Sequence, residues 1–143
     1  MDKRAARPIL RAMTLSIDAD LVIAGGGPAG AALALGAAAA GLSSVLLDPL
    51  PVETRAAPDF DGRAYSLAAA SVSLLRAVGV WEAAAADAQP MTAIELYDGR
   101  PGDPGPMRLR FDATGPEPFA VLLEDRVLRG ALLAALAAEP LVD

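Results

Sequence analysis

Three glycines and one aspartate have the types and the spacing of a nucleotide-binding site. Gly25, Gly27 and Gly30 form a G-x-G-x-x-G pattern, and Asp48 follows at about the twenty-residue distance of such sites. The first glycine of the pattern allows a tight turn, the second lets a pyrophosphate approach the backbone, and the third lets a helix pack closely on a strand. The phosphates then lie at a helix N-terminus, where free N–H groups and the helix dipole favour negative charge. A carboxylate at the position of Asp48 can accept hydrogen bonds from ribose hydroxyls.

The elements that would position these residues are a strand, a helix and a second strand. The apolar run 21–24 predicts a buried strand, and the alanine-rich run 31–40 predicts a helix. Gly41 ends that helix, and the apolar run 45–47 predicts a strand that leads into Asp48. We therefore predict a βαβ unit that binds an adenine dinucleotide. The alternative is an ordinary turn rich in alanine and glycine, with a solvated Asp48.

Composition limits the chemistry that the chain can perform. Its 143 residues fit one modest domain, and a net charge of -6 argues against a nucleic-acid partner. The chain contains neither cysteine nor histidine, which removes thiolate and imidazole catalysis and metal sites built on those groups. The absence of cysteine fits a reducing compartment. Enzymatic chemistry would have to come from a cofactor, from carboxylates or from residues outside this chain.

A membrane span is the competing interpretation of the first half of the chain. Residues 21–47 carry no charge, and a run of that length can cross a bilayer. The glycine cluster, Pro28 and Gly41 interrupt it, however, and divide it into strand, turn, helix and strand. We therefore prefer the βαβ unit.

The rest of the chain predicts a loop, two helices and then an antiparallel sheet. Residues 49–61 are polar and rich in proline, apolar spacing favours a helix over 67–78, and a short helix continues over 82–88. The runs 91–97, 107–111 and 119–123 are expected as strands, and the clean alternation of 107–111 predicts one buried face and one face in water. A helix is expected over 124–138, with Glu124 and Asp125 complementing its dipole, and another strand begins at 141.

Four segments together resemble the flavin-dependent aromatic hydroxylases, and among them the UbiH-like monooxygenases of ubiquinone biosynthesis. They are Gly25-Gly-Gly-Pro-Ala-Gly30, Asp61-Gly-Arg63, the helical run 68–81 that ends in Val80-Trp81, and the run 124–129. The resemblance extends from Asp20 to the end of the chain. The glycine motif is shared by many flavoproteins, whereas Asp61-Gly-Arg63 and the Val-Trp helix end are more specific.

The resemblance implies FAD as the cofactor, NAD(P)H as the reducing co-substrate and O2 as the oxidant. The substrate would be a small aromatic molecule, a polyprenyl phenol, and the enzyme would be cytoplasmic, peripheral to the inner membrane or associated with a ubiquinone-biosynthesis complex. On this resemblance no side chain of the chain is catalytic, and Asp48 binds the ribose. Arg63 would lie near the flavin or its phosphates; the alternative is that it is a solvated loop charge. Arg126 would contact FAD from the other side; the alternative is that it pairs with neighbouring acids. The pyrophosphate turn consists of Gly25, Gly27, Pro28, Ala29 and Gly30.

The predicted fold class is α/β: a Rossmann-like FAD-binding βαβ unit with the start of an antiparallel-sheet substrate domain, truncated. Four parts are expected: a disordered basic arm (1–18), an FAD-binding segment (19–89), strands of a partial substrate domain (90–123) and a helix returning to the FAD-binding domain (124–143). The family's later Gly-Asp segment is absent from the sequence. We therefore predict the N-terminal FAD-binding portion of a longer monooxygenase, inactive by itself. The alternatives are an NAD-binding dehydrogenase module, which Asp48 suits equally, and an inactive fragment.

Overall fold

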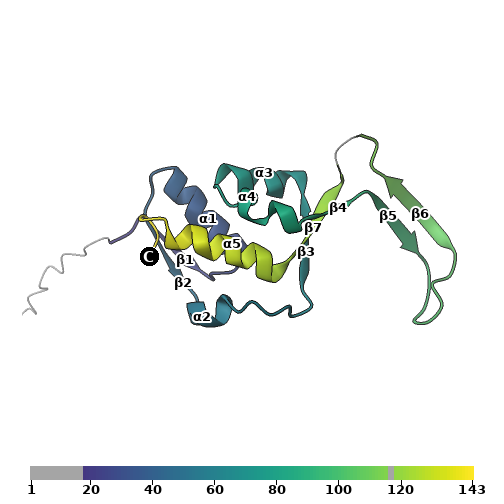
Figure 1. The fold of residues 1–143 in the computed structure, drawn as a ribbon, viewed down its shortest axis with the longest axis horizontal. Helices are drawn as coiled ribbons and strands as arrows, with labels where there is room; N and C mark the ends of the chain where they lie inside the picture. Colours follow the sequence, from purple (N-terminus) through teal and green to yellow (C-terminus); the bar gives the residue numbers. More distant parts are fainter. Residues whose placement is uncertain (1–17, 116–117) are drawn as a thin grey trace, which may run out of the picture.

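The structure, a computed structural model, describes residues 18–115 and 118–143. Apart from Asp18, the predicted basic arm lies outside the described residues. Figure 1 shows a body of helices and two small sheets, with a long hairpin that projects from one end. In chain order the elements are β1 (Leu21–Ala24), α1 (Pro28–Ala39), β2 (Ser44–Leu47), α2 (Val52–Arg55), β3 (Ala64–Ala68), α3 (Ala69–Ala77), α4 (Trp81–Ala84), the 3-10 turn η1 (Ala85–Asp87), β4 (Gln89–Met91), β5 (Ala93–Tyr97), β6 (Met107–Asp112), β7 (Ala120–Glu124) and α5 (Asp125–Ala137).

The predicted βαβ unit is confirmed. β1 and β2 pair in parallel, with Leu21 opposite Ser44 and Ala24 opposite Leu47, and α1 connects them. Parallel strands place their carboxyl ends at the same edge of a sheet. The glycine turn after β1 and Asp48 after β2 therefore lie side by side.

Helix α1 begins earlier than the alanine-rich run indicated. Its first residue is Pro28, because proline's fixed φ and missing N–H suit the first helical turn. It ends at Ala39, and Gly41 then takes a φ of +79°, which lets the chain turn back toward β2.

The last residues of the chain form hydrogen bonds with β2, in agreement with the strand predicted to begin at residue 141. Ser44 and Val142 form a parallel bridge. The Ser44 N–H donates to the Leu141 carbonyl at 2.8 Å, and the Leu46 N–H donates to the Asp143 carbonyl at 2.7 Å. β2 is therefore hydrogen-bonded on both of its edges.

A second sheet contains three antiparallel strands in the order β3-β7-β4. The prediction of a helix from residue 67 is wrong at its start, because Leu67 and Ala68 complete β3 and α3 begins at Ala69. Pairing with β7, more than fifty residues later, holds β3 in place, and local sequence patterns do not reveal such a partner. The loop predicted over 49–61 also contains the single helical turn α2.

The main core lies between α1, α3, α4, α5 and the three-stranded sheet. Leu128 and Leu132 of α5 are buried on the face predicted for them, and Leu136 is partly buried on the same face. Trp81 is a core residue, as is Leu123 of β7. Since β7 pairs with both β3 and β4, two of the four strands in segment 90–123 are attached to this core. The proposed domain boundary at residue 90 stays a prediction.

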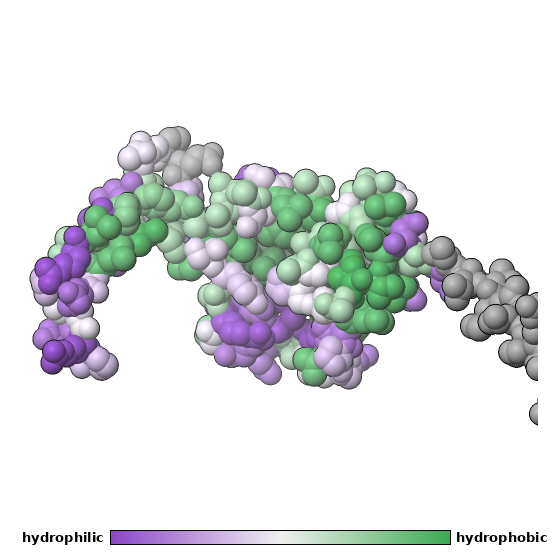
Figure 2. Space-filling view, turned by 180° about the vertical axis from the view of Figure 1, so that it is seen from behind, coloured by the Kyte–Doolittle hydropathy of each residue, from purple (hydrophilic) through white to green (hydrophobic). Residues whose placement is uncertain are grey.

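The β5–β6 hairpin projects from the body (Figure 1), and its exposure differs from the expectation. One face of β6 was predicted to be buried, but Met107, Leu109 and Phe111 are 46–49% exposed. Ile94 and Leu96 lie opposite Phe111 and Leu109 and extend the same apolar face. Figure 2 shows apolar side chains gathered over this arm, with hydrophilic residues at its far end.

None of the helices within residues 18–115 and 118–143 has by itself the length and apolar character needed to cross a membrane. The segments Ala69–Ala77 and Trp81–Asp87 are long and apolar enough for a membrane span only when they are taken together. The chain bends by 118° at the break between them.

Candidate functional site

The glycine turn after β1 has the geometry that its spacing predicts. Gly25 adopts a φ of +108°, a conformation that favours glycine. Its N–H donates to the Leu47 carbonyl at 2.7 Å, which ties the turn to the end of β2. A side chain built on Gly30 would place its Cβ 1.9 Å from the Gly25 carbonyl oxygen. The helix can therefore approach the strand only because residue 30 is glycine.

The N-terminus of α1 is open to a ligand. Gly27 is the N-cap residue, no side chain of the described residues caps the helix, and its first turn carries no acid. Among the described residues, no atom beyond its chain neighbours lies within 4 Å of a Cβ built on Gly27. The N–H groups of the first turn and the helix dipole are therefore available to an anion.

An open depression surrounds this helix start. Its lining includes all five residues predicted for the pyrophosphate turn, together with side chains of β1 and α1. These residues are Ile23, Ala24, Gly25, Gly27, Pro28, Ala29, Gly30 and Leu33. A second hollow begins at Pro28 and Ala29 and continues along α3 and α5 to Leu67. A ligand that begins at the glycine turn can therefore extend toward the second sheet.

Asp48 braces the glycine turn. Its Oδ2 accepts the Gly26 N–H at 2.7 Å, and its Oδ1 accepts the Leu50 N–H at 2.9 Å. The bond from Leu50 and then that from Gly26 hold the pKa of Asp48 below its usual value, and the charge of Arg55 acts in the same direction. The carboxylate is thus ionised at neutral pH. Because a carboxylate has about four acceptor positions, it retains capacity for ribose hydroxyls.

Arg55 belongs to the same site, although sequence reasoning missed it. Its Nη1 donates to the Gly26 carbonyl at 3.2 Å. A Cβ on Gly26 would lie 2.3 Å from that nitrogen, so a side chain at residue 26 would displace the Arg55 guanidinium from the turn. The Nε of Arg55 is buried and has no hydrogen-bond partner within the described residues. Nothing in the polar loop sequence distinguishes Arg55, because its contact depends on the unpredicted turn α2.

A second group of charges surrounds Asp125, the first residue of α5. Its side chain is 3% exposed and forms ion pairs with Arg129 at 2.5 Å and Arg63 at 3.2 Å. The Tyr65 hydroxyl donates to its Oδ1 at 2.9 Å, which raises the pKa of Tyr65. Asp125 was expected only to complement the helix dipole. It lies in the first turn as expected, and it also joins β3 to α5.

Arg63 is held in this group and is still accessible. Its Nε donates to Asp61 at 2.8 Å, and its side chain is 59% exposed. Its backbone carbonyl accepts the Asp125 N–H at 3.0 Å. The bond to Asp61 is the largest cause that raises the pKa of Arg63, followed by the charge of Asp125. Arg63 is therefore a fixed cation with an open side.

Arg126 points to different partners. Its Nε donates to Glu124 at 2.5 Å, its Nη1 donates to the Pro58 carbonyl at 3.3 Å, and its guanidinium carbon lies 5.9 Å from the centre of the Phe60 ring. The structure thus places Arg126 against the loop before β3 and gives it an acidic neighbour. In the described residues, no hydrogen bond or ion pair connects Arg63 or Arg126 to the glycine turn.

The parts of the site that lie together define a class of protein. A strand, a glycine turn, an uncapped helix N-terminus and an ionised acid after the next parallel strand form a dinucleotide-binding βαβ unit. The residues present fit such a cofactor, since the turn offers backbone N–H groups and space where the phosphates would lie.

Comparison with known proteins identifies the family. The model of the FAD binding domain family matches residues 18–141, and the chain belongs to that family. It is 34% identical over 123 residues to the ubiquinone hydroxylase UbiL of Rhodospirillum rubrum, a match that covers 85% of this chain and 28% of the relative. It is also 34% identical over 129 residues to the 3-demethoxyubiquinol 3-hydroxylase of Escherichia coli, covering 86% of this chain and 31% of the relative. The chain thus spans about a third or less of these relatives.

The fold itself recurs in solved structures. The flavin-dependent monooxygenase PieE, whose crystal structure contains FAD and substrate, matches 87% of this chain with a TM-score of 0.61 and 22% identity, over 23% of its own length. The mixed α/β arrangement predicted from the sequence is therefore a fold that also occurs in this monooxygenase.

Proposed function

We propose that this chain is the FAD-binding portion of a flavin-dependent monooxygenase that hydroxylates an aromatic ubiquinone precursor. The observation that carries the proposal is the family match over residues 18–141, which coincides with the complete glycine turn and Asp48. The names of the two hydroxylase relatives support the ubiquinone precursor, a polyprenyl phenol, as the substrate. When bound, the flavin would supply the activation of O2, with NAD(P)H as the reductant.

The chain's own residues bind and orient the cofactor in this proposal. Gly25, Gly27, Pro28, Ala29 and Gly30 form the backbone cradle for the pyrophosphate. The helix start of α1 supplies favourable N–H groups there. Asp48 binds the ribose of the adenosine through its remaining acceptor positions, with Arg55 holding the Gly26 carbonyl beside it.

The two arginines near α5 have separate roles in the proposal. Arg63 is fixed by Asp61 and Asp125 yet exposed, so it can face the flavin or its phosphates. Arg126 is paired with Glu124 and would contact FAD only from the loop side. We also propose that the whole enzyme acts in the cytoplasm, at the inner membrane or in a ubiquinone-biosynthesis complex, where a polyprenyl substrate would be reached.

An NAD-binding module is the second candidate, because an ionised Asp48 suits the ribose of NAD equally well. The test is the visible absorption spectrum of the purified protein after incubation with FAD and removal of free ligand, with NAD in a parallel sample. Retained flavin absorbance supports the proposal. A colourless protein that binds NAD supports the second candidate, and a folded protein that binds neither indicates an inactive fragment.

A further inference from the structure

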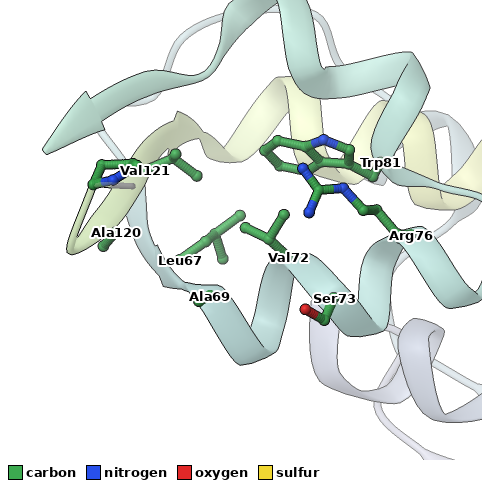
Figure 3. A pocket seen from close by; sticks show the side chains of 9 residues that line it. Leu67, Ala69, Val72, Ser73, Arg76, Trp81, Ala120 and Val121 are labelled. Atoms are coloured by element: carbon green, nitrogen blue, oxygen red, sulfur yellow. The ribbon is translucent and has the colours of Figure 1, made fainter. Parts of the chain in front are cut away.

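A small cavity lies between α3, the start of β7 and Trp81 (Figure 3). Its volume is about 130 Å³, and none of its lining residues is among the predicted cofactor residues. Leu67, Val72 and Val121 form an apolar wall, and Ser73 and Arg76 bring polar groups to it. Two chemically different surfaces therefore meet in one small space.

The apolar wall has the character of a site for a single ring. Val72 and Trp81 are each 7% exposed, so the floor is firmly packed. A dry cavity of about 150 Å³ with apolar walls is large enough for benzene. The indole of Trp81 adds an aromatic surface, against which a second ring can lie edge-to-face or offset.

Arg76 gives this cavity a positive group. Its guanidinium carbon lies 5.5 Å from the centre of the Trp81 ring, and Figure 3 shows the side chain reaching over Val72 toward that ring. The side chain has no carboxylate partner within the described residues. By contrast, the arginines at 63, 108, 110, 126 and 129 each form an ion pair.

Stacking on an aromatic ring fixes the plane of a guanidinium but leaves the N–H groups on its edge available. Those N–H groups match the two oxygens of a carboxylate. The Ser73 hydroxyl lies three residues earlier on α3, a spacing that places it on the same side of the helix.

We propose that this cavity binds a small aromatic carboxylate. The ring lies against Leu67, Val72 and Val121 beside Trp81, and the carboxylate is bound by the Arg76 guanidinium. The site uses none of the residues proposed to bind FAD, although Leu67 also lines the hollow that begins at Pro28 and Ala29.

The chain carries its own reporter for this site, because Trp81 is its one tryptophan. We would titrate the 143-residue protein with sodium benzoate and follow the Trp81 indole N–H signal by NMR. Benzamide, which keeps the ring without the charge, and acetate, which keeps the charge without the ring, are the matched ligands. The proposal predicts a saturable shift with benzoate and a dissociation constant at least about tenfold weaker with either control, since a charge-assisted bond or the ring's burial is lost.

Variants then assign the binding to Arg76. Arg76→Gln should weaken benzoate binding by about tenfold or more. Arg108→Gln, which removes another exposed arginine far along the β5–β6 hairpin, should leave it unchanged. Absence of a saturable shift, equal binding of benzamide, or an Arg76→Gln variant that binds benzoate like the wild type would each overturn the proposal.

Discussion

Replacing Gly30 by alanine tests the geometry of the glycine turn most sharply. The new Cβ would lie 1.9 Å from the Gly25 carbonyl oxygen and 3.3 Å from the Ile23 side chain. Real Cβ atoms essentially never approach another atom closer than 3.0 Å, so helix and turn must separate by about 1 Å. The obstacle is backbone, which cannot rotate away as a flexible side chain would.

The expected cost follows from two opposing effects. Overpacking of this kind costs about 3 kcal/mol at the upper end of its usual range, and the higher helix propensity of alanine offsets about 1 kcal/mol. The free energy of unfolding of Gly30→Ala should therefore fall by about 2 kcal/mol, which lowers Tm by about 4–8 °C. FAD affinity should fall as well, because the turn proposed to receive the pyrophosphate would be displaced.

Gly36→Ala is the matched control, since it makes the same change in the same helix. Within the described part of the chain, no atom outside the helix's own backbone lies within 4 Å of a Cβ built at Gly36. Only the propensity gain of about 1 kcal/mol therefore remains, and the variant should be more stable. Urea unfolding followed by circular dichroism measures both variants. If Gly30→Ala were as stable as Gly36→Ala, the close packing of α1 on the turn would be refuted.

Three further predictions concern aspartates. Asp48→Ala should weaken FAD binding by about 1–3 kcal/mol in a calorimetric titration; unchanged affinity would leave Asp48 only as a brace for the turn. Asp125→Asn should lower the free energy of unfolding by about 3 kcal/mol, because it breaks a buried ion pair. The control Asp98→Asn, which removes an exposed ion pair, should change that free energy by less than about 0.5 kcal/mol. Equal effects of the two substitutions in urea unfolding would contradict this prediction. The Ser43 N–H and then its hydroxyl hold the pKa of Asp20 below its usual value, so the stability that Asp20 contributes is full above the unfolded pKa of about 3.9 and is lost as pH falls through the folded pKa. Ser43→Ala should raise the pKa of Asp20 in an NMR pH titration, and an unchanged pKa would show that the hydroxyl has no part in lowering it.

The sequence predicts the local parts of this fold well. The glycine spacing and the apolar runs identify β1, α1 and β2, because each depends on a short pattern or on a backbone conformation that only glycine readily adopts. The family resemblance, carried by the segments from Gly25 to Arg129, is confirmed by the FAD binding domain match.

The parts that the sequence does not predict depend on partners that are distant along the chain. β3 exists through its pairing with β7, and Tyr65 contacts Asp125 across 60 residues. Arg55 contacts Gly26 across 29 residues from a helical turn too short to carry a periodic signal. Such contacts follow from tertiary packing, which local propensity does not encode.

The central claim is that the glycine turn and Asp48 hold FAD. Calorimetric titration of FAD into the purified chain, with NAD in a parallel experiment, tests this claim most directly. One FAD should bind saturably per chain, more tightly than NAD, and the binding should be weaker in Gly30→Ala and in Asp48→Ala. A folded protein that shows no saturable FAD binding, or that binds FAD equally well in both variants, would contradict it.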